Sequence, residues 1–271
     1  MKSTLLKSMT LILVFTVILV VIIQKTAQTG APAFSALDMA QYPKKGTRED
    51  YLTRDNAPDS LALLPAPPEE ISPTFKADIV AFQEGLKLRT TARGELATRD
   101  ANLAPEALSD IFTEVLEIKL SPQTTPVTYN LIYRMGWDLG GYAVYDAKHH
   151  YNRARPFMYY NITSCQPDDE AGLRKDGSYP SGHAAMGWGW ALILAEIVPE
   201  RKEKILQRGL EYGQSRVICG AHWQSDVDAG LIIGAATVSR LHSEPKFASQ
   251  LEAAKQELAI ARQKSAAQPA K

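Results

Sequence analysis

Three short segments of the chain contain residue types that suit chemistry on an anion. These segments are Lys148–Pro156, Gly177–His183 and Ser215–Asp226. They supply three cations, Lys148, Arg155 and Arg216. Planar guanidinium groups match the equatorial oxygens of a phosphoryl group, and an ammonium group adds a point charge. Each cation alone is more often a solvated surface charge, but together with two histidines they indicate a phosphoryl-binding site.

The tetrapeptide Pro180–His183 stands where a Gly/Ser-rich loop enters an apolar helix. The first turn of a helix has unpaired N–H groups and a partial positive charge, and both favour a bound anion. Gly182 lets the backbone come close to that anion, and the Ser181 hydroxyl can donate to it. The alternative is an ordinary N-cap, in which Ser181 bonds to the helix N–H groups and His183 packs inertly.

His222 and Asp226 are four residues apart and would share one face of a helix. A carboxylate bonded to one imidazole nitrogen fixes the tautomer and leaves the other nitrogen as a nucleophile. Asp226 would also stabilise the positive charge that His222 gains when it bonds to an electrophile. The alternative is a surface ion pair, which is common at this spacing.

Helical periodicity surrounds these segments. Apolar residues recur every four positions from Val127 through Leu139, on a stretch that runs toward Asp146, and again from Phe247 to Ala261. The further helices are predicted over residues 75–91, 105–118, 183–198, 200–214 and 223–241. Small residues in His222–Arg240 place that helix near the centre, and strand alternation is not evident. The fold class is therefore all-α, a single-domain helical bundle.

The N-terminus has the pattern of an export signal. Lys2 and Lys7 precede the apolar run Met9–Ile23, which is shorter than the roughly 20 residues needed to cross a bilayer as a helix. We expect a signal peptide over residues 1–33, with an uncleaved anchor as the alternative. A Pro-rich extended arm over residues 34–73, a helical domain over 74–264 and a disordered tail over 265–271 complete the predicted organisation.

Export changes the interpretation of the two cysteines. In an oxidising compartment a disulfide between Cys165 and Cys219 is favoured over two buried thiols. Cys219 lies close to His222 in the chain, so the bond would hold the backbone beside that residue.

Composition limits the classes of partner. The chain has 271 residues, with 30 Lys and Arg against 30 Asp and Glu, so no net basic field recruits nucleic acid. A second long apolar run is not present, so we expect no stable membrane partner apart from an N-terminal anchor. The apolar helical faces would permit a homodimer.

The three segments together resemble a known family. Lys148 with Arg155-Pro156, then Pro180–His183, then Arg216 with His222 and Asp226 match the motifs of the type-2 phosphatidic acid phosphatase superfamily. Within it, the chain from about Leu61 to about Ala261 is most similar to the bacterial class A nonspecific acid phosphatases. One departure is Ala184, where that class usually has Thr; it removes no candidate catalytic group. The resemblance implies the helical fold that these enzymes share with vanadium haloperoxidases.

The resemblance also implies a role for each residue. His222 would attack phosphorus and form a phosphohistidine, Asp226 would orient it, and His183 would protonate the leaving group. The phosphoryl oxygens would be held by Lys148, Arg155, Ser181, Gly182 and Arg216. No metal or other cofactor is expected, because the cations belong to the protein. The neighbouring His149 and His150 are interpreted as surface residues of a helix.

The expected substrates are small phosphate monoesters, with nucleotides, sugar phosphates and aryl phosphates all open, as is transfer to an alcohol in place of water. The predicted export signal places the protein in the periplasm. We expect an acidic to near-neutral pH optimum, because His183 must be protonated to donate and the second ionisation of a phosphate ester lies near pH 6. Three alternatives stay open at this point: a vanadate-dependent haloperoxidase, a lipid phosphate phosphatase, and a non-catalytic phosphate-binding domain.

Overall fold

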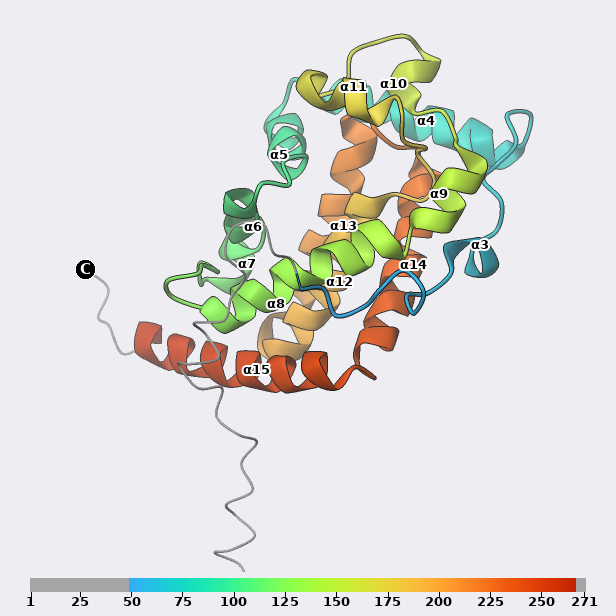
Figure 1. The fold of residues 1–271 in the computed structure, drawn as a ribbon. Coiled ribbons are helices and arrows are strands. Elements are labelled where there is room, and N and C mark those ends of the chain that lie inside the picture. The colour runs from blue at the N-terminus through green and yellow to red at the C-terminus, as the bar shows by residue number, and fades with distance from the viewer. Residues whose placement is uncertain (1–48, 267–271) are drawn as a thin grey trace, which may run out of the picture. The chain divides into compact units, whose positions relative to one another are not determined.

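The computed structural model describes residues 49–266. Within that range every regular element is a helix, which confirms the predicted all-α fold (Figure 1). The predicted signal peptide, residues 34–48 of the predicted arm and the last residues of the predicted tail lie outside the described range. Of the helices inside it, none combines the length and the apolar character that a membrane span requires.

Many of the helices begin at a proline, whose fixed φ suits the first helical turn and whose missing N–H is not needed there. In chain order the elements are α3 (Ser60–Leu63), α4 (Pro73–Leu88), α5 (Ala92–Asp100), α6 (Pro105–Ile111), α7 (Thr113–Leu116), α8 (Pro126–Trp137), the π-helix η1 (Asp138–Tyr142), α9 (Tyr145–Tyr151), α10 (Pro156–Tyr159), the 3-10 helix η2 (Pro167–Asp169), α11 (Glu170–Leu173), α12 (Gly182–Ile197), the 3-10 helix η3 (Pro199–Arg201), α13 (Lys202–Ile218), α14 (Gln224–Leu241) and α15 (Pro245–Ala266).

Helix α12 is the centre of the bundle and packs against both α13 and α14 (Figure 1). It is apolar on almost every side, as expected of a buried helix. The small residues of α14 allow the close approach that their composition predicted. A Cβ atom on Gly234 would lie 2.7 Å from the Ala185 carbonyl oxygen, so only glycine fits at this crossing.

The helix predicted to run from Val127 toward Asp146 is interrupted. α8 ends at Trp137, η1 follows, and α9 begins only at Tyr145. The four-residue apolar repeat is buried as predicted, so the interruption does not come from the pattern of apolar residues. It occurs where the chain meets α12, because the Gly140 backbone lies against the start of α12 at Gly182. A π-helical turn widens the helix at that contact.

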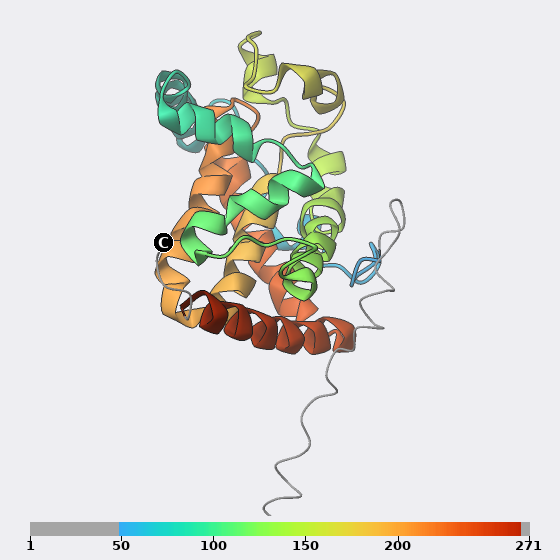
Figure 2. The ribbon, with the colours of Figure 1, turned by 90° about the vertical axis from the view of Figure 1, so that its left-hand side faces the viewer.

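Helix α15 lies at the opposite end of the domain from α10 and α11 (Figures 1 and 2). Its predicted apolar residues from Phe247 to Leu258 are buried and pack against α8. Buried Gln250 adds bonds to the Val127 carbonyl (3.1 Å) and to the Asn130 side chain (3.0 Å). These bonds join α15 to α8, two helices far apart in the chain, at a place distant from the candidate site.

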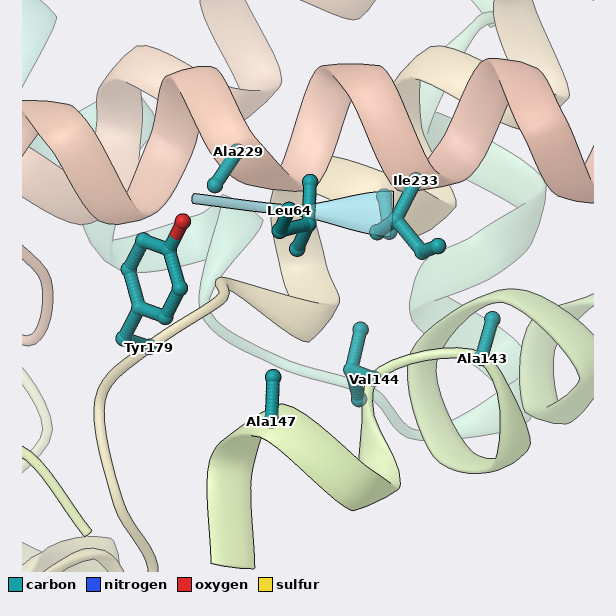
Figure 3. Close-up of a cluster of buried hydrophobic side chains, with 8 residues drawn as sticks. Leu64, Ala143, Val144, Ala147, Tyr179, Ala229 and Ile233 are labelled. Atoms are coloured by element: carbon teal, nitrogen blue, oxygen red, sulfur yellow. The ribbon is translucent and has the colours of Figure 1, made fainter. Parts of the chain in front are cut away.

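The arm is anchored to the helices where the structure describes it. Residues 49–72 contain one short helix, α3, and are otherwise irregular. Leu64 is buried with Val144, Tyr179 and Ile233 in one apolar cluster (Figure 3). The Tyr179 hydroxyl donates to the Pro65 carbonyl at 2.7 Å. Because Tyr179 immediately precedes Pro180, this bond joins the arm to the second motif segment.

Helix α5 is an element that the periodicity did not predict. Its sequence is mostly polar, but Asp100 is buried and forms a two-pronged ion pair with Arg208 of α13. Ser215 donates to the same carboxylate at 2.6 Å. This pair holds the end of α5, and therefore Ala101, against α13.

The predicted disulfide is present. Cys165 and Cys219 are bonded, with Cα atoms 4.7 Å apart, and the Cys165 N–H donates to the Cys219 carbonyl at 3.1 Å. The bond therefore joins the loop before η2 to the turn between α13 and α14.

We expect the double variant Cys165→Ser/Cys219→Ser to unfold more easily than the parent. A bond across a separation of 54 residues removes chain entropy from the unfolded state worth about 4 kcal/mol, or about 10 °C in Tm for a domain of this size. Calorimetric melting of oxidised protein checks this, with the reduced parent as the matched control. An unchanged Tm would contradict it.

Candidate active site

Backbone hydrogen bonds join the three motif segments to one another. Each segment is tied to both of the others, so their relative positions do not depend on side chains alone. The bonds run from Ser178 N to Arg153 O (2.9 Å), from Ser181 N to Asp226 O (2.9 Å) and from N of Phe157, the residue directly after the first segment, to Gly220 O (3.0 Å). The start of α12, the end of α13 and the start of α14 therefore meet around one site.

His222 lies in that site with its ring almost fully buried. Its Nε2 is 3.0 Å from Nη1 of Arg155. A guanidinium group only donates hydrogen bonds, so Nε2 must hold a lone pair and the ring proton must be on Nδ1. Burial, and then the positive charges of Arg155 and Lys148, hold the pKa of His222 well below its usual value. A neutral ring with its lone pair among cations is suited to nucleophilic attack.

Asp226 faces the other side of the same ring, but the expected geometry was wrong in one respect. His222 precedes the helix, since α14 begins at Gln224, so the pair does not share a helical face. Nδ1 of His222 lies 3.5 Å from Oδ2 of Asp226, a close contact without hydrogen-bond geometry. Oδ2 instead accepts from the Trp223 N–H at 2.8 Å, because Asp226 closes the first turn of α14.

Arg153 holds the remaining oxygen of Asp226 and was not predicted. Its Nη1 donates to Oδ1 of Asp226 at 2.6 Å, and its Nη2 donates to the buried Asp78 of α4 at 2.9 Å. Asp78 also accepts from the Ser225 N–H and hydroxyl. The series His222, Asp226, Arg153 and Asp78 therefore extends from the ring to a helix far away in the sequence.

Arg216 provides the clearest mark of an anion site. Its side chain is fully buried, and its Nη2 donates to Oε1 of Gln166 at 2.5 Å. Nε and Nη1 have no hydrogen-bond partner among the residues that the structure describes. Burial lowers the pKa of Arg216 to about 10, so the group stays charged. Unpaired buried donors on a cation are costly unless an anion accepts from them.

Lys148 and Arg155, the other two cations, are also buried. Lys148 donates to the Gly177 carbonyl at 2.7 Å, and burial, reinforced by the charge of Arg155, lowers its pKa to about 8. Burial also lowers the pKa of Arg155. The carboxylate of Asp176, which was not predicted to contribute, lies 3.4 Å from Lys148 and 3.1 Å from Arg155.

Ser181 and Gly182 form the start of α12. Ser181 is its N-cap, and its hydroxyl oxygen accepts from the Ala184 N–H at 3.3 Å. This is the geometry of the N-cap alternative, and it leaves the hydroxyl hydrogen for a second partner. Gly182 faces the backbone, because a Cβ there would lie 2.8 Å from the Gly140 carbonyl oxygen. The need for glycine comes at least in part from packing against η1.

His183 lies one residue further along α12. Its Nε2 is 3.2 Å from the Ala101 carbonyl oxygen, which can only accept, so Nε2 carries a hydrogen. Burial, and then the charge of Arg216, holds the pKa of His183 well below its usual value. The charge of Arg155 acts on this pKa in the same direction, so two of the candidate phosphoryl-binding cations lower the pKa of His183.

His149 and His150 are exposed on α9, as predicted. Within residues 49–266, no three His, Cys, Asp or Glu side chains are grouped so as to hold a metal ion. The absence of a resident metal in the functional enzyme stays a prediction.

The sequence was compared with known families and proteins. The family model of the PAP2 superfamily matches residues 131–245, which contain all three motif segments. Over 209 residues the chain is 48% identical to the non-specific acid phosphatase of Providencia stuartii, covering 77% of this chain and 84% of that protein. This chain belongs to the PAP2 superfamily. Within the superfamily it is a bacterial class A acid phosphatase, as its motifs indicated, and its reaction class is hydrolysis of phosphoric monoesters.

Two further relatives of this PAP2 chain carry similar names. The non-specific acid phosphatase of Salmonella typhi is 41% identical over 225 residues, covering 83% of this chain and 90% of that protein. An acid phosphatase of Zymomonas mobilis is 39% identical over 208 residues, covering 75% and 77% respectively. These matches extend well beyond the motifs, so the helical framework is shared as well as the site.

We expect Arg153 to be a positioning residue for His222. Arg153→Met leaves the buried Asp226 carboxylate without its charged partner, so kcat should fall about 100-fold, the cost of a small misplacement of a reacting group, with KM changed less than about threefold. Stability should fall by roughly 3 kcal/mol. Steady-state kinetics and thermal melting check this.

The matched control for Arg153 is Arg134→Met, which removes a half-buried arginine bonded to Gln250 on a different part of the bundle. It should lose stability and keep kcat. Arg153→Lys should recover part of kcat, since it keeps the charge but not the forked geometry. Equal losses of kcat in Arg153→Met and Arg134→Met would contradict the assignment.

Lys148 should set the alkaline limit of anion binding. Its pKa is about 8, so the ammonium is charged below that pH and is lost as pH rises through it. Sulfate keeps two charges throughout this range, so its inhibition constant should be flat from pH 6 to 7.5 and rise above about pH 8. Lys148→Arg should remove the rise. If the inhibition constant of sulfate rose at the same pH in Lys148→Arg, a group other than Lys148 would be responsible for the rise.

Proposed function

We propose that this enzyme hydrolyses phosphate monoesters through a phosphohistidine on His222, with His183 as the general acid and without a metal. The observation that carries the proposal is the 3.0 Å contact between Nη1 of Arg155 and Nε2 of His222. It supports the proposal because Nε2 then holds the lone pair and lies beside a cation that would bind the phosphoryl group. A nucleophile and its electrostatic support are thereby combined.

In the first step Nε2 of His222 attacks phosphorus, and the bond from phosphorus to the ester oxygen breaks. Lys148, Arg155 and Arg216 hold the equatorial oxygens, together with the Ser181 hydroxyl and the Gly182 N–H. Asp226 stabilises the charge that the ring acquires. The unpaired donors of Arg216 suit this role, because they are already desolvated before the substrate arrives.

His183 supplies the proton for the departing oxygen. Its Nε2–H is held by the Ala101 carbonyl, so Nδ1 is the atom that carries the transferred proton. The pKa of His183 is lowered by burial and by neighbouring cations, and a bound phosphate dianion would offset those cations. Protonation is therefore coupled to substrate binding and favoured at acidic pH. In the second step water attacks phosphorus and gives its proton to His183. The bond from phosphorus to Nε2 of His222 breaks, which returns the lone pair to Nε2 and releases phosphate.

The pocket that we propose for the leaving group has a volume of about 300 Å³ and begins next to Ala101, whose carbonyl contacts His183. It is lined by the residues that follow Ala101 and by Met186, which is one turn beyond His183 on α12. Trp137, Tyr133 and Trp190 make its walls largely apolar. We therefore place aryl and nucleoside phosphates ahead of sugar phosphates as substrates.

We also propose that the enzyme acts in the periplasm. The basic start and apolar run of residues 1–33 support export, and the bond between Cys165 and Cys219 requires an oxidising compartment to persist. Transfer of the phosphoryl group to an alcohol in place of water stays open to the same site, because water and alcohol would attack from the same side.

Acid-labile phosphate should be trapped on His222. With a ³²P-labelled aryl phosphate and rapid quenching in base, the parent should carry label that is stable to alkali and lost in acid. His222→Ala should carry none and should have no measurable turnover while its melting curve stays within a few degrees of the parent. EDTA should leave turnover unchanged. Label that persists in His222→Ala would exclude this nucleophile.

The effect of a substitution at His183 should depend on the leaving group, and this dependence distinguishes His183 from the other site residues. His183→Ala should reduce turnover of an alkyl phosphate at least about 100-fold, at the lower end of the usual range for general acid catalysis. Its effect on p-nitrophenyl phosphate should be much smaller, because that leaving group needs little protonation. Equal losses on both substrates would mean that His183 binds phosphate and does not transfer a proton.

A further inference from the structure

Asp176 places a negative charge in the phosphoryl site. Its Oδ2 is 3.1 Å from Nη2 of Arg155 and 3.4 Å from Nζ of Lys148. Among residues 49–266, Asp176 is the only acidic residue that forms an ion pair with Lys148 or with Arg155. The two cations are buried, whereas the Asp176 side chain is 44% exposed. The carboxylate therefore covers the two cations from the solvent side.

All the donors of Arg155 have partners within the protein. Its five N–H groups are directed at three kinds of acceptor: backbone carbonyls, the His222 ring and the Asp176 carboxylate. The contacts are Nη1 to Ala221 O (2.9 Å) and His222 Nε2 (3.0 Å), Nη2 to Asp176 Oδ2 (3.1 Å) and Gly177 O (3.3 Å), and Nε to Leu173 O (3.0 Å) and Asp176 O (3.1 Å). A phosphoryl oxygen can bind Arg155 only by replacing one of them.

These partners differ in how readily they can be replaced. The carbonyl groups belong to the backbone that joins the motif segments, and moving them would disturb the site. The hydrogen bond from Arg155 to the His222 lone pair is lost only when that lone pair forms the bond to phosphorus. The Asp176 side chain can rotate into solvent while its backbone stays bonded to Arg155. Asp176 is therefore the partner that an incoming phosphoryl group displaces.

We propose that Asp176 is a specificity-determining residue, whose carboxylate competes with the phosphoryl group for Arg155 and Lys148. This inference rests on the proposed function of the site. The competition weakens binding of the substrate and of product phosphate alike, so it raises KM and relieves product inhibition. It also discriminates by charge, because a carboxylate repels a phosphate dianion more strongly than a monoanion.

The net charge of the site predicts whether removing the Asp176 charge strengthens or weakens binding of a dianion. Lys148, Arg155 and Arg216 contribute three positive charges, and ionised Asp176 leaves two for the ligand. A phosphate dianion then brings the group to neutrality, while a neutral residue at 176 would leave one positive charge in excess and hold the dianion more tightly. Four other titratable side chains act on these cations. Asp226 is paired with Arg153, Asp100 is paired with Arg208, Asp169 is exposed so that solvent screens its charge, and Tyr212 is buried with a raised pKa. The rings of His183 and His222 have lowered pKa values and carry no charge.

Sulfate binding to the full chain tests the proposal without turnover. By calorimetry at pH 6, Asp176→Asn should bind sulfate about fivefold more tightly than the parent, the order of effect of a partly exposed ion pair. Its KM for p-nitrophenyl phosphate should fall by a similar factor, and by more at pH 7 than at pH 5, since the second ionisation of a phosphate ester lies near pH 6. Inhibition by inorganic phosphate should tighten in parallel.

Three variants serve as controls. Asp168→Asn removes an exposed aspartate of η2 and should leave sulfate affinity unchanged. Asp176→Glu keeps the charge and should stay near the parent, whereas Asp176→Ser, a second neutral side chain, should repeat the effect of Asp176→Asn. Unchanged sulfate affinity in both neutral variants would overturn the proposal. Weaker binding in both would also overturn it, because Asp176 would then support Arg155.

Failure of this inference can be distinguished from failure of the proposed function. If the parent forms phosphohistidine and hydrolyses the ester but sulfate affinity does not respond to residue 176, only this inference fails. If the parent neither turns over nor carries label, the proposed function fails, and the sulfate titration still reports whether Asp176 competes for an anion.

Discussion

The guanidinium group of Arg155 is the interaction on which the rest of the site depends. It belongs to the first motif segment, donates to backbone carbonyls of the second and third, and donates to the lone pair of His222. Burying this charge is costly, and the fold offsets the cost by directing ordered acceptors at every donor. The same acceptors hold the three segments around one point, so binding chemistry and local folding have a common cause.

Two supports fix the groups on either side of this point. On one side Asp78 and Arg153 hold Asp226, which faces the His222 ring. On the other side Gln166 bonds to both Arg216 and the Ala101 carbonyl that receives His183, and the neighbouring Cys165 is tied to Cys219. Each support joins a helix end to a loop, which is how an all-helical bundle can position a site precisely enough for phosphoryl transfer.

Local pattern was sufficient for much of the fold. Helices with a continuous apolar face, such as α8, α12 and α15, follow from periodicity, because burying that face is what stabilises them. Helix α5 did not follow, since it is held by a buried ion pair between Asp100 and Arg208 and not by an apolar stripe. The π-helical turn η1 was not predicted either, because it lies where Gly140 meets the start of α12, a contact between segments distant in the chain.

The sequence by itself determined the chemical identity of the site: two histidines, three cations and a carboxylate in three ordered segments, a set with few other uses. The tertiary structure decided what each group touches. In the folded chain His222 precedes its helix, and one oxygen of Asp226 accepts from Arg153. Ser181 is an N-cap, and Asp176 pairs with two of the cations. The physical reason is that residue type limits charge and hydrogen-bonding capacity, while partners, burial and therefore pKa depend on distances that only the folded chain defines.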